Sequence, residues 1–139
     1  MKFIEHGVFE VETEANLLLV DATGPFSDEA AKHYIEAVEV CIQQLEASQW
    51  NQIITLHQVS LFTPEVENLL TAALIKRKTR GLIAVFLILE DVYFKPLVKE
   101  QWSRCYTKAD IEHHFFDSTF EAKESLIQFP NHIPLTNFY

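Results

Sequence analysis

The longest apolar run in the chain follows Gly81 and continues to Leu89, where Glu90-Asp91 closes it. A strand with one face in water alternates apolar and polar residues, so an unbroken run predicts a strand covered on both faces. Eight residues are few for a helix, and Val, Ile and Phe favour strands. The run is also far too short to span a bilayer. We therefore expect 81–89 to be a buried strand of a parallel sheet flanked by helices.

The residues before this run predict an antiparallel hairpin and a helix. Residues 8–13 alternate in part, as in a strand with one solvated face, and 17–22 form a more apolar strand after a short polar turn. Gly24-Pro25 ends the second strand. Ser27 is a good N-cap, and a single apolar stripe then continues over four turns to Leu45, which predicts a helix.

A strand–helix unit follows at 50–80. Residues 50–56 are mostly apolar and predict a third strand. Thr63-Pro64-Glu65 is a helix start, with an N-cap, a proline at the first helical position and an acidic first turn. The apolar residues from Val66 to Leu74 keep helical spacing, and Gly81 can stop the helix.

Residues 92–106 predict a third helix, in which Pro96 is tolerated because it falls within the first turn. Its apolar residues occupy nearly half the helix circumference: Phe94, Leu97, Val98, Trp102, Cys105 and Tyr106. A helix lying on a sheet needs an apolar stripe only about 100° wide. This helix therefore has apolar surface beyond what core packing requires.

The last predicted elements are a strand at 111–116 and a helix that opens at a Ser118-x-x-Glu121 capping box and continues to Gln128. We expect its inward-facing residues to be Phe120, Leu126 and Ile127. The tail 129–139 holds two prolines and three aromatic residues. It is too apolar to be freely solvated, so we expect it to dock on its own domain or on a second subunit.

The element order predicts one α/β domain over residues 1–139. Repeated strand–helix alternation implies mostly parallel strands joined by right-handed crossovers. We expect a sandwich with a central sheet of about five strands, an N-terminal antiparallel hairpin and about four helices.

Charge is unevenly distributed along the chain. The net charge of −9 disfavours nucleic acid as a partner. Residues 76–108 nevertheless carry eight basic and three acidic residues, a net +5, and the remainder carries −14. The basic residues at 76–80 fit a solvated helix end, where cations meet the negative pole, as well as they fit a binding patch.

The sequence holds no recognisable catalytic motif, so we predict a protein that is not an enzyme and has no cofactor. Phosphate loops, dinucleotide fingerprints, zinc-protease and serine-hydrolase motifs are all missing. His113 and His114 point to opposite faces of a strand, which is poor geometry for a shared metal. Glu90-Asp91 lie where α/β proteins commonly place ligands, but helix capping by Asp91 explains them equally well.

Cysteine usage and the N-terminus indicate a cytoplasmic protein. Cys41 and Cys105 form no CxxC pair, and we expect both to be buried or half-buried fillers. The first residues lack the sustained apolar segment of a secretory signal.

The element order, Gly24-Pro25 before the first helix and the strand–Thr-Pro–helix unit at 53–74 resemble a STAS domain. The group most similar to this chain is the stand-alone bacterial SpoIIAA-like proteins, over nearly all of 8–128. In the anti-sigma-factor antagonists of that superfamily a phosphorylatable serine lies in Asp-Ser-Ser-Gly, where this chain has Thr63-Pro64-Glu65-Val66. A kinase-driven partner switch is therefore in doubt, and we expect Thr63 to act as an N-cap.

The resemblance implies a non-enzymatic module that binds lipophilic ligands or associates with membranes. If the helices at 64–80 and 92–106 separate, they open an apolar pocket lined by Phe62, Leu70, Phe94, Val98, Trp102 and Tyr106. A basic rim for an anionic head group or the inner membrane surface would consist of Lys76, Arg77, Lys78, Lys95 and Lys99. The alternative is a regulatory protein-interaction module that acts as a homodimer.

Overall fold

The computed structural model describes residues 2–5 and 7–128. Their strands are β1 (Lys2–Glu5), β2 (Gly7–Glu14), β3 (Leu17–Thr23), β4 (Trp50–Gln58), β5 (Leu82–Val92) and β6 (Glu112–Phe116). Their helices are α1 (Asp28–Leu45), α2 (Pro64–Thr79), α3 (Lys95–Lys108) and α4 (Thr119–Gln128). The predicted α/β class is confirmed, with β1 as a strand that the sequence pattern did not predict.

The strands lie in one sheet in the order of the chain, β1-β2-β3-β4-β5-β6. β1, β2 and β3 are antiparallel neighbours, so the predicted N-terminal hairpin is confirmed. From β3 to β6 every pairing is parallel, with a helix in each crossover. Sequential parallel strands with crossovers of one hand place α1, α2 and α3 on the same face of the sheet.

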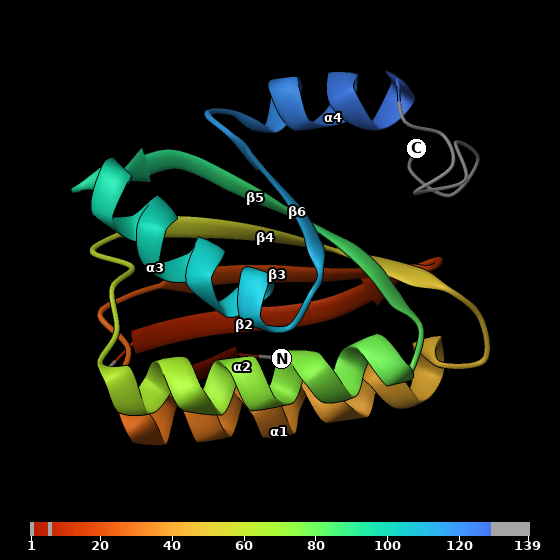
Figure 1. The fold of residues 1–139 in the computed structure, drawn as a ribbon, viewed down its shortest axis with the longest axis horizontal. Helices are drawn as coiled ribbons and strands as arrows, with labels where there is room; N and C mark the ends of the chain where they lie inside the picture. The colour runs from red at the N-terminus through yellow and green to blue at the C-terminus, as the bar shows by residue number, and fades with distance from the viewer. Residues whose placement is uncertain (1, 6, 129–139) are drawn as a thin grey trace.

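The sheet separates two unequal layers. α1 and α2 lie below it and α4 lies above it, while α3 runs obliquely beside β6 (Figure 1). The main core joins the three longer helices to the sheet, and a smaller apolar cluster lies on the α4 side around Leu17, Ala84 and Phe86. α4 is short, so within the described residues the β2 and β3 end of its face is the less covered part (Figure 1).

β5 has both faces covered, as its unbroken apolar run predicted. Leu82 to Leu89 are buried except Ile83, which is half-buried. The pairing of β5 with β4 shifts by one residue at two places, between Leu82 and Val85 and between Ile88 and Asp91. Each shift changes the face of the sheet to which the following residues of β5 point. After the second shift Asp91 pairs with His57. β5 continues to Val92, three residues beyond its predicted end, so α3 begins only at Lys95.

The loops after β3 and β4 pack closely against each other at the carboxyl edge of the sheet. A Cβ at Gly24 would lie 2.1 Å from the carbonyl oxygen of Val59, so only glycine fits there. The Gly24-Pro25 bond is cis. The Phe26 amide then donates to the Leu61 carbonyl oxygen at 3.1 Å. This contact fixes the loop that leads into α2.

The predicted helix boundaries are confirmed where caps define them. The side chains of Ser27 and Thr63 accept hydrogen bonds from the amides three residues on, which makes both N-caps. Gly81 has φ +107 directly after α2. The Ser118 side chain caps α4 by accepting a hydrogen bond from the Glu121 amide.

One orientation predicted from the sequence is wrong, and one of two interpretations left open for Asp91 is excluded. Phe120 is 70% exposed, because α4 turns Ala122 toward the sheet and a residue two positions earlier lies on the opposite side of the helix. Asp91 does not cap α3, whose N-cap residue is Phe94 without a side-chain bond. The side chains of Leu126 and Ile127 and the tail 129–139 lie outside the described residues, so their predicted packing stays a prediction.

Two substitutions with opposite signs test the turn conformations. Gly81→Ala should lower the free energy of unfolding by about 1–3 kcal/mol, because its φ is +107 and its Cβ would lie 2.7 Å from the Ser48 carbonyl oxygen. Ala15→Gly should raise it by about 0.5–1 kcal/mol, because the exposed Ala15 in the β2–β3 turn has φ +54. Urea denaturation followed by circular dichroism measures both changes. Equal effects of the same sign would contradict these conformations.

Candidate functional site

The residues predicted to line a pocket divide into five buried side chains and one exposed side chain. Phe62, Leu70, Val98, Trp102 and Tyr106 are at most 6% exposed and belong to the main core. The structure thus brings these five together between α2, α3 and the sheet. Phe94 is 66% exposed and lies outside this group.

The space between α2, α3 and α1 is almost filled. The Phe62 ring meets the Trp102 ring edge to face at 5.2 Å between centroids, and Phe26 meets the same indole at 6.1 Å. A cavity of only about 20 Å³ remains beside Leu70 and Trp102. Sites for drug-sized ligands measure roughly 300–1,000 Å³. In this conformation the helix pair has no room for a lipophilic ligand.

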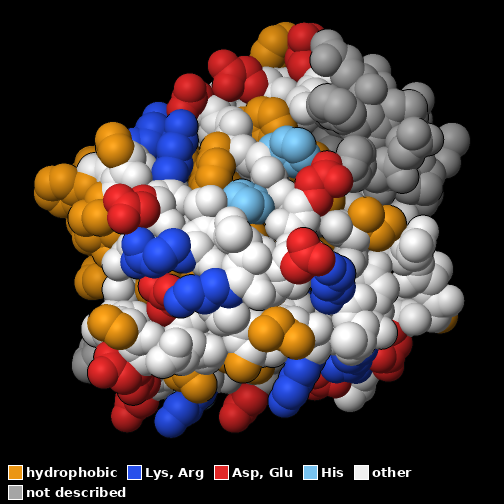
Figure 2. Space-filling view, in the orientation of Figure 1, with side chains coloured by type: hydrophobic (Ala, Val, Ile, Leu, Met, Phe, Trp, Pro, Cys, Tyr) orange, Lys and Arg blue, Asp and Glu red, His pale blue; other side chains and the backbone are white. Residues whose placement is uncertain are grey.

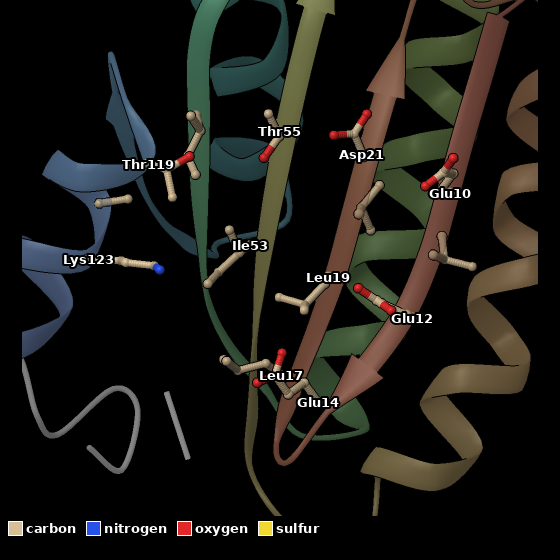
Figure 3. A pocket seen from close by; sticks show the side chains of 14 residues that line it. Glu10, Glu12, Glu14, Leu17, Leu19, Asp21, Ile53, Thr55, Thr119 and Lys123 are labelled. Atoms are coloured by element: carbon tan, nitrogen blue, oxygen red, sulfur yellow. The ribbon is translucent and has the colours of Figure 1, made fainter. Parts of the chain in front are cut away.

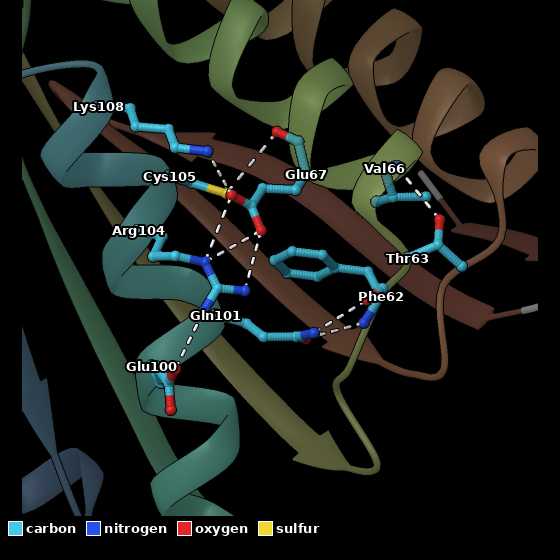
Figure 4. Close-up of polar contacts among 9 residues, drawn as sticks. All are labelled: Phe62, Thr63, Val66, Glu67, Glu100, Gln101, Arg104, Cys105 and Lys108. Atoms are coloured by element: carbon cyan, nitrogen blue, oxygen red, sulfur yellow. Dashed lines mark hydrogen bonds and ion pairs between the residues drawn. The ribbon is translucent and has the colours of Figure 1, made fainter.

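A buried carboxylate ties α2 to α3. Glu67 is in the first turn of α2, and its side chain is 10% exposed. It accepts hydrogen bonds from Arg104 Nη2 at 3.0 Å and from Lys108 Nζ at 2.6 Å, both on α3 (Figure 4). The hydrogen bond from Arg104 and then that from Lys108 outweigh burial and lower the pKa of Glu67. Its charged form therefore holds the helix pair closed.

Two further contacts join α3 to the loop before α2. The Gln101 amide accepts from the Phe62 amide and donates to the Phe62 carbonyl oxygen, each at 3.0 Å (Figure 4). Trp102 Nε1 donates to the Ser60 carbonyl oxygen at 2.9 Å. Separating the helices would break these hydrogen bonds, each of which contributes about 0.5–1.5 kcal/mol to stability.

The residues predicted to form one basic rim lie at opposite ends of the helix pair. Lys76 and Lys78 are in the last turn of α2, whereas Lys95 and Lys99 are at the start of α3, which lies at the other end of the sheet (Figure 1). Arg77 is 4% exposed, with its guanidinium 5.4 Å from the Tyr34 ring centroid.

Most of these cations have intramolecular partners. Lys78 pairs with Asp110 at 2.9 Å and Lys95 with Asp117 at 3.0 Å. Lys99 Nζ lies 5.9 Å from the Phe115 ring centroid. The structure therefore does not gather the five basic residues into one patch.

The surplus apolar surface predicted for 92–106 is concentrated at the start of α3. Tyr93, Phe94 and Leu97 are 57%, 66% and 46% exposed, and we call these three residues the aromatic tip. Hydrophobic side chains gather there at the left edge of the molecule (Figure 2). The Tyr93 amide donates to the Gln58 carbonyl oxygen at 2.9 Å, which anchors the tip to β4.

The backbone of the aromatic tip is strained. Phe94 has φ 56 and ψ 45, the left-handed conformation that bulky residues rarely adopt. This conformation costs of order 1–3 kcal/mol and needs support from its surroundings. The Phe94 carbonyl oxygen accepts hydrogen bonds from the Leu97 and Val98 amides at 3.0 Å, so the strain is held by the first turn of α3.

A histidine between two aspartates is a feature that sequence reasoning missed. His57 Nε2 lies 3.0 Å from Asp21 Oδ2, and His57 Nδ1 lies 2.6 Å from Asp91 Oδ1. Asp21 lies at the carboxyl end of β3, His57 at that of β4 and Asp91 at that of β5. Partial burial lowers the pKa of His57, but the hydrogen bonds to Asp21 and Asp91 and their charges outweigh it, so the pKa is raised above 6.5.

This cluster is an ion-pair network with no free ring nitrogen. Ionised carboxylates only accept hydrogen bonds, so both ring nitrogens of His57 donate when the imidazole is protonated, which is the form that the raised pKa favours. Across residues 2–5 and 7–128, no group of three or more His, Cys, Asp or Glu side chains could hold a metal ion. The signal in the sequence was a polar residue at the end of each of three neighbouring strands.

The two cysteines are not activated thiols. Cys105 is buried, and burial raises its pKa to about 11. Cys41 is half-buried, and burial raises its pKa as well. Both are placed as predicted, and both stay protonated at neutral pH.

No family model matches the chain, and no curated protein matches it significantly. Its resemblance to STAS domains therefore stays a prediction. In the part of the chain that the structure describes, no helix is both long and apolar enough to cross a membrane.

The Glu67 contacts can be tested by substitution. Glu67→Gln should lower the free energy of unfolding by about 1–2 kcal/mol, because a buried carboxylate loses its charge and two cationic partners. Glu100→Gln is the matched control, since Glu100 also pairs with Arg104 but is 67% exposed and should cost at most about 0.5 kcal/mol. The Glu67 contribution is present above pH 4.5 and is lost as pH falls through its lowered pKa. Urea denaturation at pH 7 and at pH 3 measures this contribution to the free energy of unfolding. Equal losses of that free energy in Glu67→Gln and Glu100→Gln would contradict this account.

The His57 cluster predicts a pH dependence of the opposite direction. Because its pKa is raised on folding, the cluster stabilises the fold fully below pH 6.5 and loses this contribution as pH rises through the folded pKa. The contribution should be about 0.2–1 kcal/mol, since both aspartates are more than half exposed. NMR titration of the His57 ring should give a pKa above 6.5 that falls in Asp21→Asn and Asp91→Asn. An unchanged pKa in both variants would refute the cluster.

Proposed function

We propose that the protein is a non-enzymatic STAS-like binding module that docks a partner protein through the aromatic tip. The observation that carries this proposal is Phe94, a large apolar side chain that is exposed and held at positive φ. Phe94 stays 66% exposed, so burial of its ring does little to offset the strain. Backbone strain of this kind clusters at functional and binding sites, where the surrounding structure holds it.

Residue types at the tip support a protein partner. Tyrosine and phenylalanine supply much of the binding energy of protein interfaces, because each buries a large rigid surface. The three side chains expose on the order of 300 Å² together. A stable interface needs roughly 800 Å² from each partner. The tip therefore fits the anchor of a transient complex better than the whole interface of a stable homodimer.

Charges near the tip define the chemistry of the partner. Glu90 beside the tip is exposed, Lys95 is paired with Asp117 and Glu100 with Arg104, and the chain carries −9 overall. An acidic protein with an exposed aromatic anchor is complementary to an apolar pocket surrounded by Lys or Arg. The same charges oppose approach to an anionic membrane surface.

A ligand inside the helix pair is less well supported than docking at the tip. Such a ligand would have to displace the packed Trp102 and Tyr106 rings and break the Glu67 and Gln101 contacts. Docking at the tip requires no rearrangement of the core. The lipophilic-ligand and membrane functions suggested by the sequence thus rank below protein docking.

A photo-crosslinking amino acid placed at position 94 in cells tests the proposal. Position 40 on α1 is the control, because Val40 is also apolar and 51% exposed. The protein captured only from position 94 is then purified and titrated with wild type, Phe94→Ala and Val40→Ala. We expect Phe94→Ala to weaken binding about tenfold or more and Val40→Ala to leave it unchanged. Equal affinities of all three proteins would contradict the proposal.

A second variant separates docking from stability. Phe94→Gly should weaken docking but raise the free energy of unfolding by about 0.5–1 kcal/mol, because glycine adopts positive φ without strain. Co-sedimentation with phosphatidylcholine and phosphatidylglycerol vesicles tests the membrane alternative. Vesicle binding by wild type that is lost in Phe94→Gly would assign the tip to membranes and reject a protein partner.

A further inference from the structure

An open trough lies on the α4 side of the sheet, on the face opposite α2 and α3. It has a volume of about 570 Å³ and runs between β2, β3, β4 and α4 (Figure 3). Leu17, Leu19, Ile53 and Ile88 form an apolar floor. Leu19 and Ile53 are half-buried and so reachable from the trough. This volume is within the range of small-molecule sites.

Carboxylates line one wall of the trough at regular spacing. Glu10, Glu12 and Glu14 alternate along β2 and project to the same side as the floor (Figure 3). In the register of β2 with β3, Glu12 is opposite Leu19 and Glu14 is opposite Leu17. Every second residue of an antiparallel strand advances about 6.8 Å. Each of these two carboxylates therefore stands beside an apolar floor residue, at a repeat of about 6.8 Å.

The balance of charge favours a cation. The described lining residues include the three glutamates and Asp21 against Lys123 of α4, a formal balance of −3, and Asp21 is shared with His57. Glu12 and Glu14 are exposed. A ligand for this trough needs a hydrocarbon surface for the floor and positive charges along one side.

We propose that the trough binds a linear aliphatic polyamine lying along β2. Four methylenes separate two ammonium groups by about 6 Å, because each bond of an extended chain advances about 1.2 Å. This spacing matches the repeat of Glu12 and Glu14. The ammonium groups pair with these carboxylates, and the methylene segments cover Leu19 and Ile53, the half-buried part of the floor. The site is independent of the aromatic tip and of partner docking.

Asp21 connects the trough to the His57 cluster. Asp21 lines the trough and accepts a hydrogen bond from His57 Nε2. A bound ammonium group near Asp21 competes with the charged imidazole for the same carboxylate. Polyamine binding should therefore lower the pKa of His57, and by linkage the affinity should rise as His57 loses its proton.

Titration of the full chain with spermidine, followed by methyl NMR at low salt, tests the proposal. We expect saturable shifts of the Leu17, Leu19 and Ile53 methyl groups that weaken strongly with added salt. Glu12→Gln with Glu14→Gln should weaken binding about fivefold or more. Glu29→Gln with Glu36→Gln is the matched control, because these exposed α1 residues give the same change in net charge on the other face of the sheet. The control should bind like wild type.

Several results would overturn the proposal. Equal weakening in the two double variants, or equal shifts with magnesium chloride, would reduce the effect to general charge attraction. Equal shifts with butane-1,4-diol would show that the positive charges are not needed. Nuclear Overhauser contacts from the floor methyl groups to residues 129–139, or to a second copy of the chain, in the free protein would assign the trough to that occupant instead.

Discussion

The burial of β5 on both faces is the constraint on which the rest of the structure depends. One face of β5 packs against the core under α1, α2 and α3, and the other packs against α4. A strand without a polar face cannot lie at a solvated surface, so both layers must be present. α3 and α4 follow β5 in the chain, and their positions decide which other surfaces remain open.

The two register shifts of β5 then determine where polar groups meet. The second shift brings Asp91 opposite His57, while Asp21 reaches the same ring from β3. It also extends β5 to Val92, so that the chain must turn sharply before α3 can begin. Phe94 makes that turn at positive φ. The ion-pair cluster and the aromatic tip are therefore two consequences of one local irregularity.

The contacts of α3 explain why the tip is exposed although the rest of the helix is buried. Gln101, Trp102, Arg104 and Lys108 hold the middle and the end of α3 against α2 and its preceding loop. Because α3 runs obliquely, its first turn projects beyond the sheet (Figure 1). The closed helix pair and the exposed tip thus favour recognition at a surface over ligand storage in the interior. The trough has a separate origin, since α4 covers the β5 and β6 side of its face and, within residues 7–128, no helix lies over the acidic side of β2.

The sequence by itself determined the fold class, the order of elements and most helix ends. Apolar periodicity reflects burial, and the caps at Ser27, Thr63 and Gly81 act through neighbours in the chain, so both are readable locally. The sequence also indicated that 92–106 has more apolar surface than a sheet can cover. It identified five core residues as pocket residues, because periodicity cannot tell a filled interior from an open one.

Only the tertiary structure decided which charges meet. Arg77 is buried although its sequence neighbours are exposed. Lys76 and Lys78 lie at the opposite end from Lys95 and Lys99, because parallel crossovers align α2 and α3. Asp21, His57 and Asp91 are distant in sequence and converge through strand pairing and a register shift. The carboxylates of β2 face an apolar floor only because β3 and β4 lie beside them. Such contacts depend on register and packing over long sequence separations, which local patterns do not encode.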